Sequence, residues 1–253
     1  MILDAFNLQG KVAMVTGCNT GLGQSMALAL AEAGCKVVGV NRSAPIETLE
    51  KMNAAEHDFL DLRADLVTQD DIPQIIEKTL EHFGQIDILI NNAGIIRREN
   101  AVDFSEQDWD DVMNVNSKSL FFLSQAVAKQ FIKQGKGGKI INIASMLSFQ
   151  GGIRVPSYTA SKSAVMGLTK AMANEWAKYN INVNAIAPGY MATNNTAALQ
   201  ADEARNASIL ERIPAERWGT TKDIAGPCVF LASEAANYIN GYTLAVDGGW
   251  LAR

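Results

Sequence analysis

Tyr158 and Lys162 are the residues whose types and spacing most directly suggest chemistry. They stand four positions apart in SYTASKSAVMG, residues 157–167, where small residues favour a helix. On a helix, positions i and i+4 share one face, so the ammonium can stand beside the phenol. A nearby cation favours the phenolate and lowers the pKa of tyrosine from its usual value of about 10. Such a pair can transfer a proton, although the spacing alone also fits a solvated helix face.

Further polar residues accompany predicted strand ends or interrupt a helix. Ser145 ends the string INIAS, Asn92 belongs to NNAG at residues 91–94, and Asn116 lies within the helical segment MNVNSKS. An amide is a mediocre helix former, so Asn116 needs a local reason to be there. The two amides and the glycine of NNAG suit contacts with a planar group.

A glycine-rich turn, TGCNTGLGQ, follows the first apolar run and carries Gly17, Gly21 and Gly23. Glycines between a strand and a helix let the backbone approach a pyrophosphate and direct helix N–H groups toward it. The spacing G-x-x-x-G-x-G is related to the dinucleotide fingerprint G-x-G-x-x-G but not identical to it. We interpret the turn as a dinucleotide site, with a turn that serves packing alone as the alternative.

The second apolar run ends in GVNRS, where a carboxylate commonly binds the adenosine ribose of NAD. Asn41 takes that place and Arg42 follows it. An amide can still bind a ribose hydroxyl, and a guanidinium suits the 2′-phosphate of NADP. These residues permit NADP(H) and remove the usual signal for strict use of NAD(H). A solvated cation at the strand end is the alternative for Arg42.

The elements that must position these residues alternate along the chain. Short apolar runs begin near residues 11, 35, 59, 86, 139, 181 and 242, and helical periodicity marks segments such as GQSMALALAEAG and DIPQIIEKTLEHFG. This alternation is typical of a parallel sheet that helices bury on both faces. We predict an α/β fold, a single-domain, doubly wound Rossmann-type fold over residues 1–253 with a seven-stranded parallel sheet.

The segment at about residues 191–217 interrupts the alternation with a polar, helix-prone stretch that ends in RIPAERWG. It follows a predicted strand end, where the sites of such folds lie, so we expect it to act as a substrate lid. An ordinary helical hairpin on the surface is the alternative.

Composition limits the possible partners. The 253 residues carry 22 basic and 27 acidic side chains, and the net charge of −5 argues against a nucleic-acid or anionic-membrane surface. Three scattered cysteines fit neither a disulfide framework nor a metal site. The sequence has no long apolar run, so we expect a cytoplasmic protein without metal, nucleic-acid or membrane partners.

Together these motifs resemble the short-chain dehydrogenase/reductase family over nearly the whole chain. The matching pieces are TGCNTGLG, ADL at Asp65, NNAG, Asn116, Ser145, Tyr158, Lys162 and PG at Pro188. The resemblance implies hydride transfer to or from NAD(H) or NADP(H). Tyr158 would exchange the hydroxyl proton, Ser145 would bind the reacting oxygen, and Asn116 would hold a water that leads to Lys162.

The cofactor residues that this resemblance implies gather at the predicted strand ends. They are Gly17, Asn19, Thr20, Gly21, Leu22, Gly23, Asn41, Arg42, Asp65, Leu66, Asn92, Ala93, Gly94, Tyr158, Lys162, Pro188, Gly189, Met191 and Thr193. Lys162 would bind the nicotinamide ribose. Thr193 would contact the nicotinamide amide or, as the alternative, cap a helix.

Longer strings, including NNAGIIRRE and RIPAERWG, resemble a bacterial subgroup of the family. Its members act on keto-deoxy sugar acids, such as 2-dehydro-3-deoxy-D-gluconate or 2-deoxy-D-gluconate, in the breakdown of hexuronates from pectin and alginate. We expect such a substrate, bound by Arg97, Ser145, Gln150, Arg154 and Tyr158. Arg97 and Arg154 would hold its carboxylate, with solvated loop arginines as the alternative. The subgroup suggests NAD(H), so the cofactor preference stays open.

Two other functions stay open. The chain can be a 3-oxoacyl-carrier or other carbonyl reductase of the same family, although the composition does not indicate a basic docking surface for an acyl carrier. It can also be a non-catalytic dinucleotide sensor, which would not need the complete catalytic set. Tetramers are common in the family, so we expect a homotetramer. Trp250 and Leu251 would then lie at a subunit contact or in the core of their own chain.

Overall fold

Seven parallel strands form one sheet in the computed structural model, which describes residues 1–253. They are β1 (Val12–Thr16), β2 (Lys36–Asn41), β3 (Phe59–Arg63), β4 (Ile88–Asn91), β5 (Gly138–Ile143), β6 (Ile181–Pro188) and β7 (Thr243–Val246). The order across the sheet is β3-β2-β1-β4-β5-β6-β7. The strand order therefore reverses between β1 and β4, and the predicted seven-stranded parallel sheet is confirmed.

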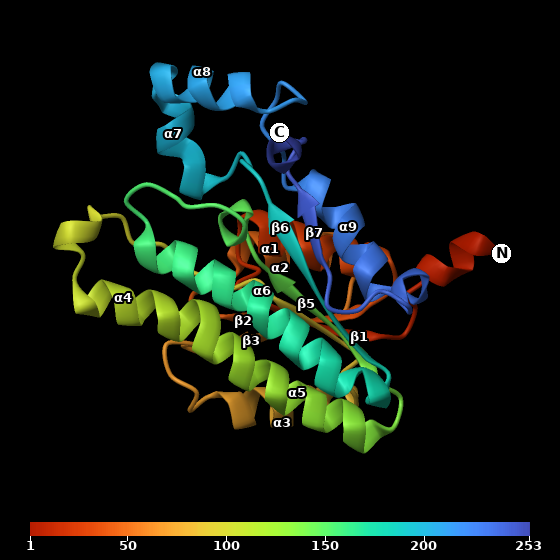
Figure 1. Ribbon diagram of the computed structural model, residues 1–253. Coiled ribbons are helices and arrows are strands. Elements are labelled where there is room, and N and C mark those ends of the chain that lie inside the picture. Colours follow the sequence, from red (N-terminus) through yellow and green to blue (C-terminus); the bar gives the residue numbers. More distant parts are fainter.

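Helices cover both faces of the sheet (Figure 1). They are α1 (Gly21–Glu32), α2 (Ile46–Ala54), α3 (Ile72–Phe83), α4 (Glu106–Met113), α5 (Leu120–Gln134), α6 (Pro156–Trp176), α7 (Ala197–Ala201), α8 (Glu203–Arg212) and α9 (Lys222–Ala232). The core layer on one face contains α3, α5 and α6, and the layer on the other contains α1, α2 and α9. This is the predicted doubly wound arrangement. No helix has the length and apolar character that a membrane span requires.

Alternating side chains along each strand build these two core layers. Val12 and Met14 of β1 belong to the layer with α3, α5 and α6, whereas Ala13 and Val15 belong to the other. Successive side chains of a strand point to opposite faces, and here helices cover both faces. Every residue of β1 is therefore buried, which explains why such strands read as continuous apolar runs.

The carboxyl ends of the central strands meet at one edge of the sheet. β1 leads into the glycine-rich turn, β4 ends inside NNAG, and β5 ends shortly before Ser145. Parallel pairing places Asn91 of β4 beside Asn142 of β5. Doubly wound folds bind ligands at this edge, where the strand order reverses. The sequence-predicted site residues are therefore collected in the expected place.

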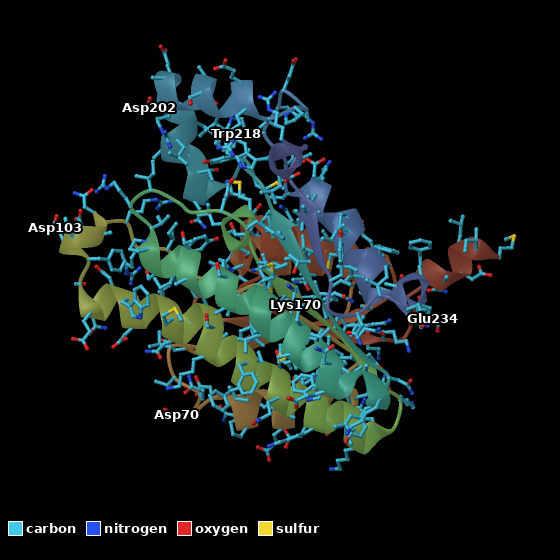
Figure 2. The ribbon with its side chains drawn as sticks, in the orientation of Figure 1. Asp70, Asp103, Lys170, Asp202, Trp218 and Glu234 are labelled. Carbon is cyan, nitrogen blue, oxygen red and sulfur yellow. The ribbon has the colours of Figure 1, made fainter.

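The predicted insertion rises above the end of β6 (Figure 1) as a short 3-10 helix, η6 (Asn194–Thr196), followed by α7 and α8. A single parallel bridge between Met191 and Gly219 closes its base. Figure 2 shows Asp202 at the outer turn of this segment and Trp218 on the side nearer the sheet. The helical insertion is thus present, and its action as a substrate lid stays a prediction.

Two glycines at the start of α1 should respond differently to substitution by alanine. A Cβ on Gly23 would lie 2.2 Å from the carbonyl oxygen of Gly17 and 2.4 Å from Asn92 Nδ2, whereas a Cβ on Gly21 meets nothing within 4 Å. Gly21 has a left-handed φ of 61°, so Gly21→Ala should cost about 1–2 kcal/mol of backbone strain. Gly23→Ala must displace backbone and should lower the thermal unfolding midpoint further. Equal shifts for the two variants would contradict this packing.

Candidate active site

Strand β5 and helix α6 bring Ser145, Tyr158 and Lys162 together. Ser145 follows β5, and the other two lie in the first turns of α6. The Ser145 hydroxyl lies close enough to the phenol of Tyr158 to lower its pKa. Lys162 Nζ lies 5.6 Å from the centre of the Tyr158 ring. A hydroxyl, a phenol and an ammonium at this spacing can bind an alcohol or ketone oxygen and exchange its proton.

Asn116 lies in a π-helical turn, Asn114–Ser119, between α4 and α5. Widened turns of this kind are frequent at functional sites. The amide Nδ2 donates to the carbonyl of Ile95 and to Ser161 Oγ, each at 3.0 Å, while Oδ1 accepts from the Ile95 N–H at 2.8 Å. These bonds give the local reason for an asparagine here, because they tie the segment after NNAG to α6. Its water-holding role stays a prediction.

Burial and two neighbouring groups set the proton affinity of Tyr158. Burial raises its pKa, whereas the nearby Ser145 hydroxyl and the positive charge of Arg98 lower it. Burial lowers the pKa of Lys162 to about 8. The Lys162 ammonium donates to the carbonyl of Ile143 at 2.6 Å. Lys162 thus lies beside the Tyr158 ring and bonds to the backbone, and its action on the phenol stays a prediction.

The glycine-rich turn between β1 and α1 fits a dinucleotide pyrophosphate. Gly17 has a left-handed φ of 64°. The N–H groups of Leu22 and Gly23 at the start of α1 have no protein acceptor, which is what an anion at a helix N-terminus requires. A Cβ on Gly94 would lie 3.2 Å from Asn116 Oδ1 and 3.7 Å from Lys162 Nζ. The absence of a side chain at Gly94 therefore leaves space beside Asn116 and Lys162.

Asn41 points under the glycine-rich turn rather than toward the surface. Its side chain is buried, Oδ1 accepts from the Cys18 N–H at 2.8 Å, and Nδ2 lies 3.5 Å from Cys18 Sγ. Arg42 and Ser43 are exposed at the same strand end. The Asn41 amide therefore holds the turn, and Arg42 is the cation left to meet the adenosine end of a cofactor.

The other predicted cofactor residues lie along the same edge. Asn19, Thr20, Gly21, Leu22 and Gly23 belong to the turn and the start of α1, Asp65 and Leu66 follow β3, Asn92, Ala93 and Gly94 follow β4, and Pro188, Gly189, Met191 and Thr193 end or follow β6. Asn92 Nδ2 donates to the carbonyls of Thr16 and Gly17 at 2.9 Å, which ties β4 to the turn. The Thr193 N–H donates to Thr196 Oγ1 at 3.1 Å at the start of η6. Hydrogen bonds from residues after β4 and β6 thus hold the loops at this edge of the sheet in place.

The two arginines predicted to hold a substrate carboxylate are already paired. Arg97 lies 3.1 Å from both Asp108 and Asp111. Arg154, with a left-handed φ of 63°, lies 3.6 Å from Glu99. A second anion would have to compete with these carboxylates.

Arg98 is a residue that the sequence reasoning missed. Its charge acts on Tyr158, and its Nη2 lies 3.4 Å from the carbonyl oxygen of Asn195 in η6. Its neighbour Arg97 turns instead to the acidic side chains of α4. The sequence shows the Arg-Arg pair, but nothing in it tells which of the two faces the site.

Gln150 lies where the loop after Ser145 meets the lid segment. Its Oε1 accepts from Arg212 Nη2 at 3.2 Å, and the Arg212 guanidinium stacks 4.0 Å from the centre of the Trp250 ring. Trp250 is buried against Ile209 and Ile213 of its own chain. Gln150 and Trp250 also line a cavity of about 440 Å³. Trp250 thus belongs to the core of its own chain, the second of the two predicted placements.

Comparison with known proteins agrees with this geometry. Residues 17–251 match the family model described as Enoyl-(Acyl carrier protein) reductase. The chain is 70% identical over 253 residues to the 2-dehydro-3-deoxy-D-gluconate 5-dehydrogenase of Escherichia coli (strain K12), with 100% of both chains covered. It is 69% identical, with the same coverage, to the enzyme of that name from Dickeya dadantii (strain 3937). The chain belongs to the short-chain dehydrogenase/reductase family.

A solved member of the short-chain dehydrogenase/reductase family shares the whole fold. The gluconate 5-dehydrogenase from Burkholderia cenocepacia J2315, described in complex with NADP and tartrate, is 38% identical. It has a TM-score of 0.95 and 100% coverage of both chains. As a short-chain dehydrogenase/reductase, the protein is an NAD(P)-dependent oxidoreductase, and the prediction of its family and enzyme class is confirmed.

Replacing Tyr158 by phenylalanine tests the proton transfer. Tyr158→Phe removes one hydroxyl and keeps the ring, so we expect kcat to fall by about 10²- to 10⁴-fold, the usual contribution of acid–base catalysis. Cofactor binding, measured by titration, should change little. An unchanged kcat would exclude Tyr158 as the acid and base.

Proposed function

We propose that the protein is a 2-dehydro-3-deoxy-D-gluconate 5-dehydrogenase that acts in hexuronate breakdown. The observation that carries this proposal is the 70% identity over the full chain to an enzyme of that name. In oxidation, the C5 alcohol of the sugar acid loses a hydride to NAD(P)⁺ and a proton to the protein. The products are 3-deoxy-D-glycero-2,5-hexodiulosonate and reduced cofactor. The related substrate 2-deoxy-D-gluconate would react in the same way at its own carbinol.

The side chains of this site divide the work of moving the proton. The nicotinamide, when bound, supplies or accepts the hydride. Tyr158 takes the alcohol proton in oxidation and returns it in reduction, and Ser145 binds the same oxygen through its hydroxyl. Support for these roles comes from the proximity of the two side chains, since the Ser145 hydroxyl lowers the pKa of Tyr158. The charge of Arg98 favours the phenolate form of Tyr158. Lys162 and Asn116 place further polar groups beside Gly94 in the same site.

Arg98 is our choice for the carboxylate of the substrate. Its Nη2 lies 3.4 Å from the Asn195 carbonyl of η6, its charge lowers the pKa of Tyr158, and it has no carboxylate partner among the ion pairs of the structure. Arg154 remains a second candidate, because its contact with Glu99 is long at 3.6 Å and its side chain is 56% exposed. Gln150, held by Arg212, has its Nε2 left to donate to a substrate hydroxyl.

The segment at about 191–217 is proposed to cover the substrate as a lid. Its far end is anchored to the C-terminal segment, because the Ala215 N–H donates to the Gly248 carbonyl at 3.0 Å and Arg253 Nη2 donates to the Glu211 carbonyl at 2.6 Å. The near end, η6 and α7, contains no buried residue. A segment anchored at one end and exposed at the other can open and close above the site.

We also propose that the protein is a cytoplasmic homotetramer. Trp109, Phe122 and Ile132 of α4 and α5 are each about two-fifths exposed, and β7 is an edge strand of the sheet. Apolar side chains and free strand edges are common at subunit contacts. Three free, buried cysteines agree with a reducing compartment.

A substrate profile with both cofactors tests the function. The purified protein is supplied with 2-dehydro-3-deoxy-D-gluconate, 2-deoxy-D-gluconate, D-gluconate and, in the reverse direction, a 3-oxoacyl thioester. We expect the highest kcat/KM with a deoxy sugar acid. Preference for the thioester would make the protein an acyl reductase, and cofactor binding without turnover of any substrate would make it a sensor.

Arg98→Met should raise KM for 2-dehydro-3-deoxy-D-gluconate by about ten- to a hundredfold, since charged hydrogen bonds contribute roughly 1.5–3 kcal/mol. Arg97→Met is the matched control, because Arg97 pairs with Asp108 and Asp111 instead. Its KM should stay near that of the wild type. Equal effects of Arg98→Met on the sugar acid and on an uncharged analogue would contradict the carboxylate assignment.

Arg42→Ala should weaken the binding of NADP(H) more than the binding of NAD(H), because only NADP(H) offers a 2′-phosphate to the guanidinium. Dissociation constants of both cofactors, measured on wild type and variant, decide the point. Equal losses would leave Arg42 as a solvated cation at the end of β2.

A further inference from the structure

Three buried polar side chains lie beneath the glycine-rich turn. We call Gln24, Asn41 and Thr48 the turn clamp. They come from α1, β2 and α2, and their exposed fractions are 8%, 2% and 0%. Burying polar groups in this way is costly unless their hydrogen bonds are made. The bonds of the clamp go to the backbone of the turn.

Thr48 holds two successive carbonyl groups of the turn. Its Oγ1 donates to the carbonyl of Cys18 at 2.7 Å and lies 3.3 Å from that of Asn19. The same oxygen accepts from Gln24 Nε2 at 3.0 Å, and this amide also lies 3.4 Å from the Asn19 carbonyl. One hydroxyl has a single proton and two acceptor sites, so Thr48 cannot donate fully to both carbonyls. The Gln24 amide supplies a second donor for the Asn19 carbonyl.

These contacts also fix the direction in which the N–H of each peptide group points. The chain has no cis peptide bond, and in a trans peptide the N–H points away from the C=O. With the Cys18 and Asn19 carbonyls turned inward, the N–H groups of Asn19 and Thr20 must turn outward. No protein group accepts a hydrogen bond from either. Successive outward N–H groups form an anion-binding concavity.

We propose that Thr48 is a positioning residue for the cofactor. Its hydroxyl orients the peptide groups whose N–H atoms bind the pyrophosphate, although Thr48 itself touches no cofactor. The inference rests on the NAD(P) dependence of the enzyme and is independent of which sugar acid it oxidises. Binding measurements without substrate therefore test it separately from the proposed function.

The exposed end of the clamp provides a control. Lys51 Nζ donates to Gln24 Oε1 at 2.9 Å and to Glu47 at 2.7 Å. Lys51→Met removes this outer contact and leaves the bonds from Thr48 to the turn in place. It should leave the Kd of NADPH within about threefold of the wild-type value, since exposed pairs contribute little.

The test compares Thr48→Val with Thr48→Ser. Valine has the shape of threonine but cannot donate, so the Kd of NADPH, titrated with the full-length protein, should rise about ten- to thirtyfold through the two lost contacts. Serine keeps the hydroxyl and should restore binding to within about threefold. At saturating NADPH, kcat of Thr48→Val should stay near the wild-type value, because the catalytic residues are untouched.

The Kd of adenosine 2′-monophosphate distinguishes a change in the orientation of the turn from a general shift of α2. This fragment lacks the pyrophosphate, so its Kd should be the same in Thr48→Val and wild type. Unchanged NADPH binding in Thr48→Val would overturn the proposal, and so would an equal loss for NADPH and the fragment. If Thr48→Val does not fold, Gln24→Met should weaken NADPH binding and spare the fragment, and the reverse result would reject the proposal.

Discussion

The placement of helix α6 depends on hydrogen bonds between buried polar groups. Asn142 of β5 donates to Thr169 of α6 at 2.9 Å and accepts from Asn91 of β4 at 2.8 Å. Nearer the site, Ser148 donates to the Lys162 carbonyl at 2.6 Å. An unpaired polar group at these depths costs about 1–3 kcal/mol, so the helix is held in one register. That register decides where Tyr158 and Lys162 stand relative to Ser145.

Hydrogen bonds of buried polar side chains also join the other parts of the site to the edge of the sheet. Asn116 connects the segment after NNAG to α6 through Ser161, whose hydroxyl donates to the Tyr158 carbonyl at 2.8 Å. Asn92 and the turn clamp fasten the glycine-rich turn from two sides. Amides and hydroxyls therefore position backbone, while the groups with a chemical task, the phenol and the cations, are few. Pre-organised sites owe much of their effect to such supporting contacts.

The fold could be predicted from the sequence, and the candidate catalytic residues could be proposed from it, because their signals are local. Strands covered on both faces are continuous apolar runs, and the spacing of Tyr158 and Lys162 follows from helix geometry. Side-chain partners could not be predicted in this way. Asn41 turns to Cys18, and Lys162 bonds to the Ile143 carbonyl. The roles of Arg97 and Arg98 depend on which carboxylates α4 presents, and that is a property of the folded chain.

A structure of the complex with NADP⁺ and 2-deoxy-D-gluconate would test whether Tyr158 and Ser145 bind the reacting oxygen. We expect the reacting oxygen to lie within about 2.6–3.2 Å of both the Tyr158 and the Ser145 hydroxyls, the reach of a hydrogen bond. The substrate carboxylate should lie against Arg98 beneath the lid segment. A sugar acid bound with its carbinols away from Tyr158, or with its carboxylate turned from Arg98, would contradict the roles assigned to these two residues.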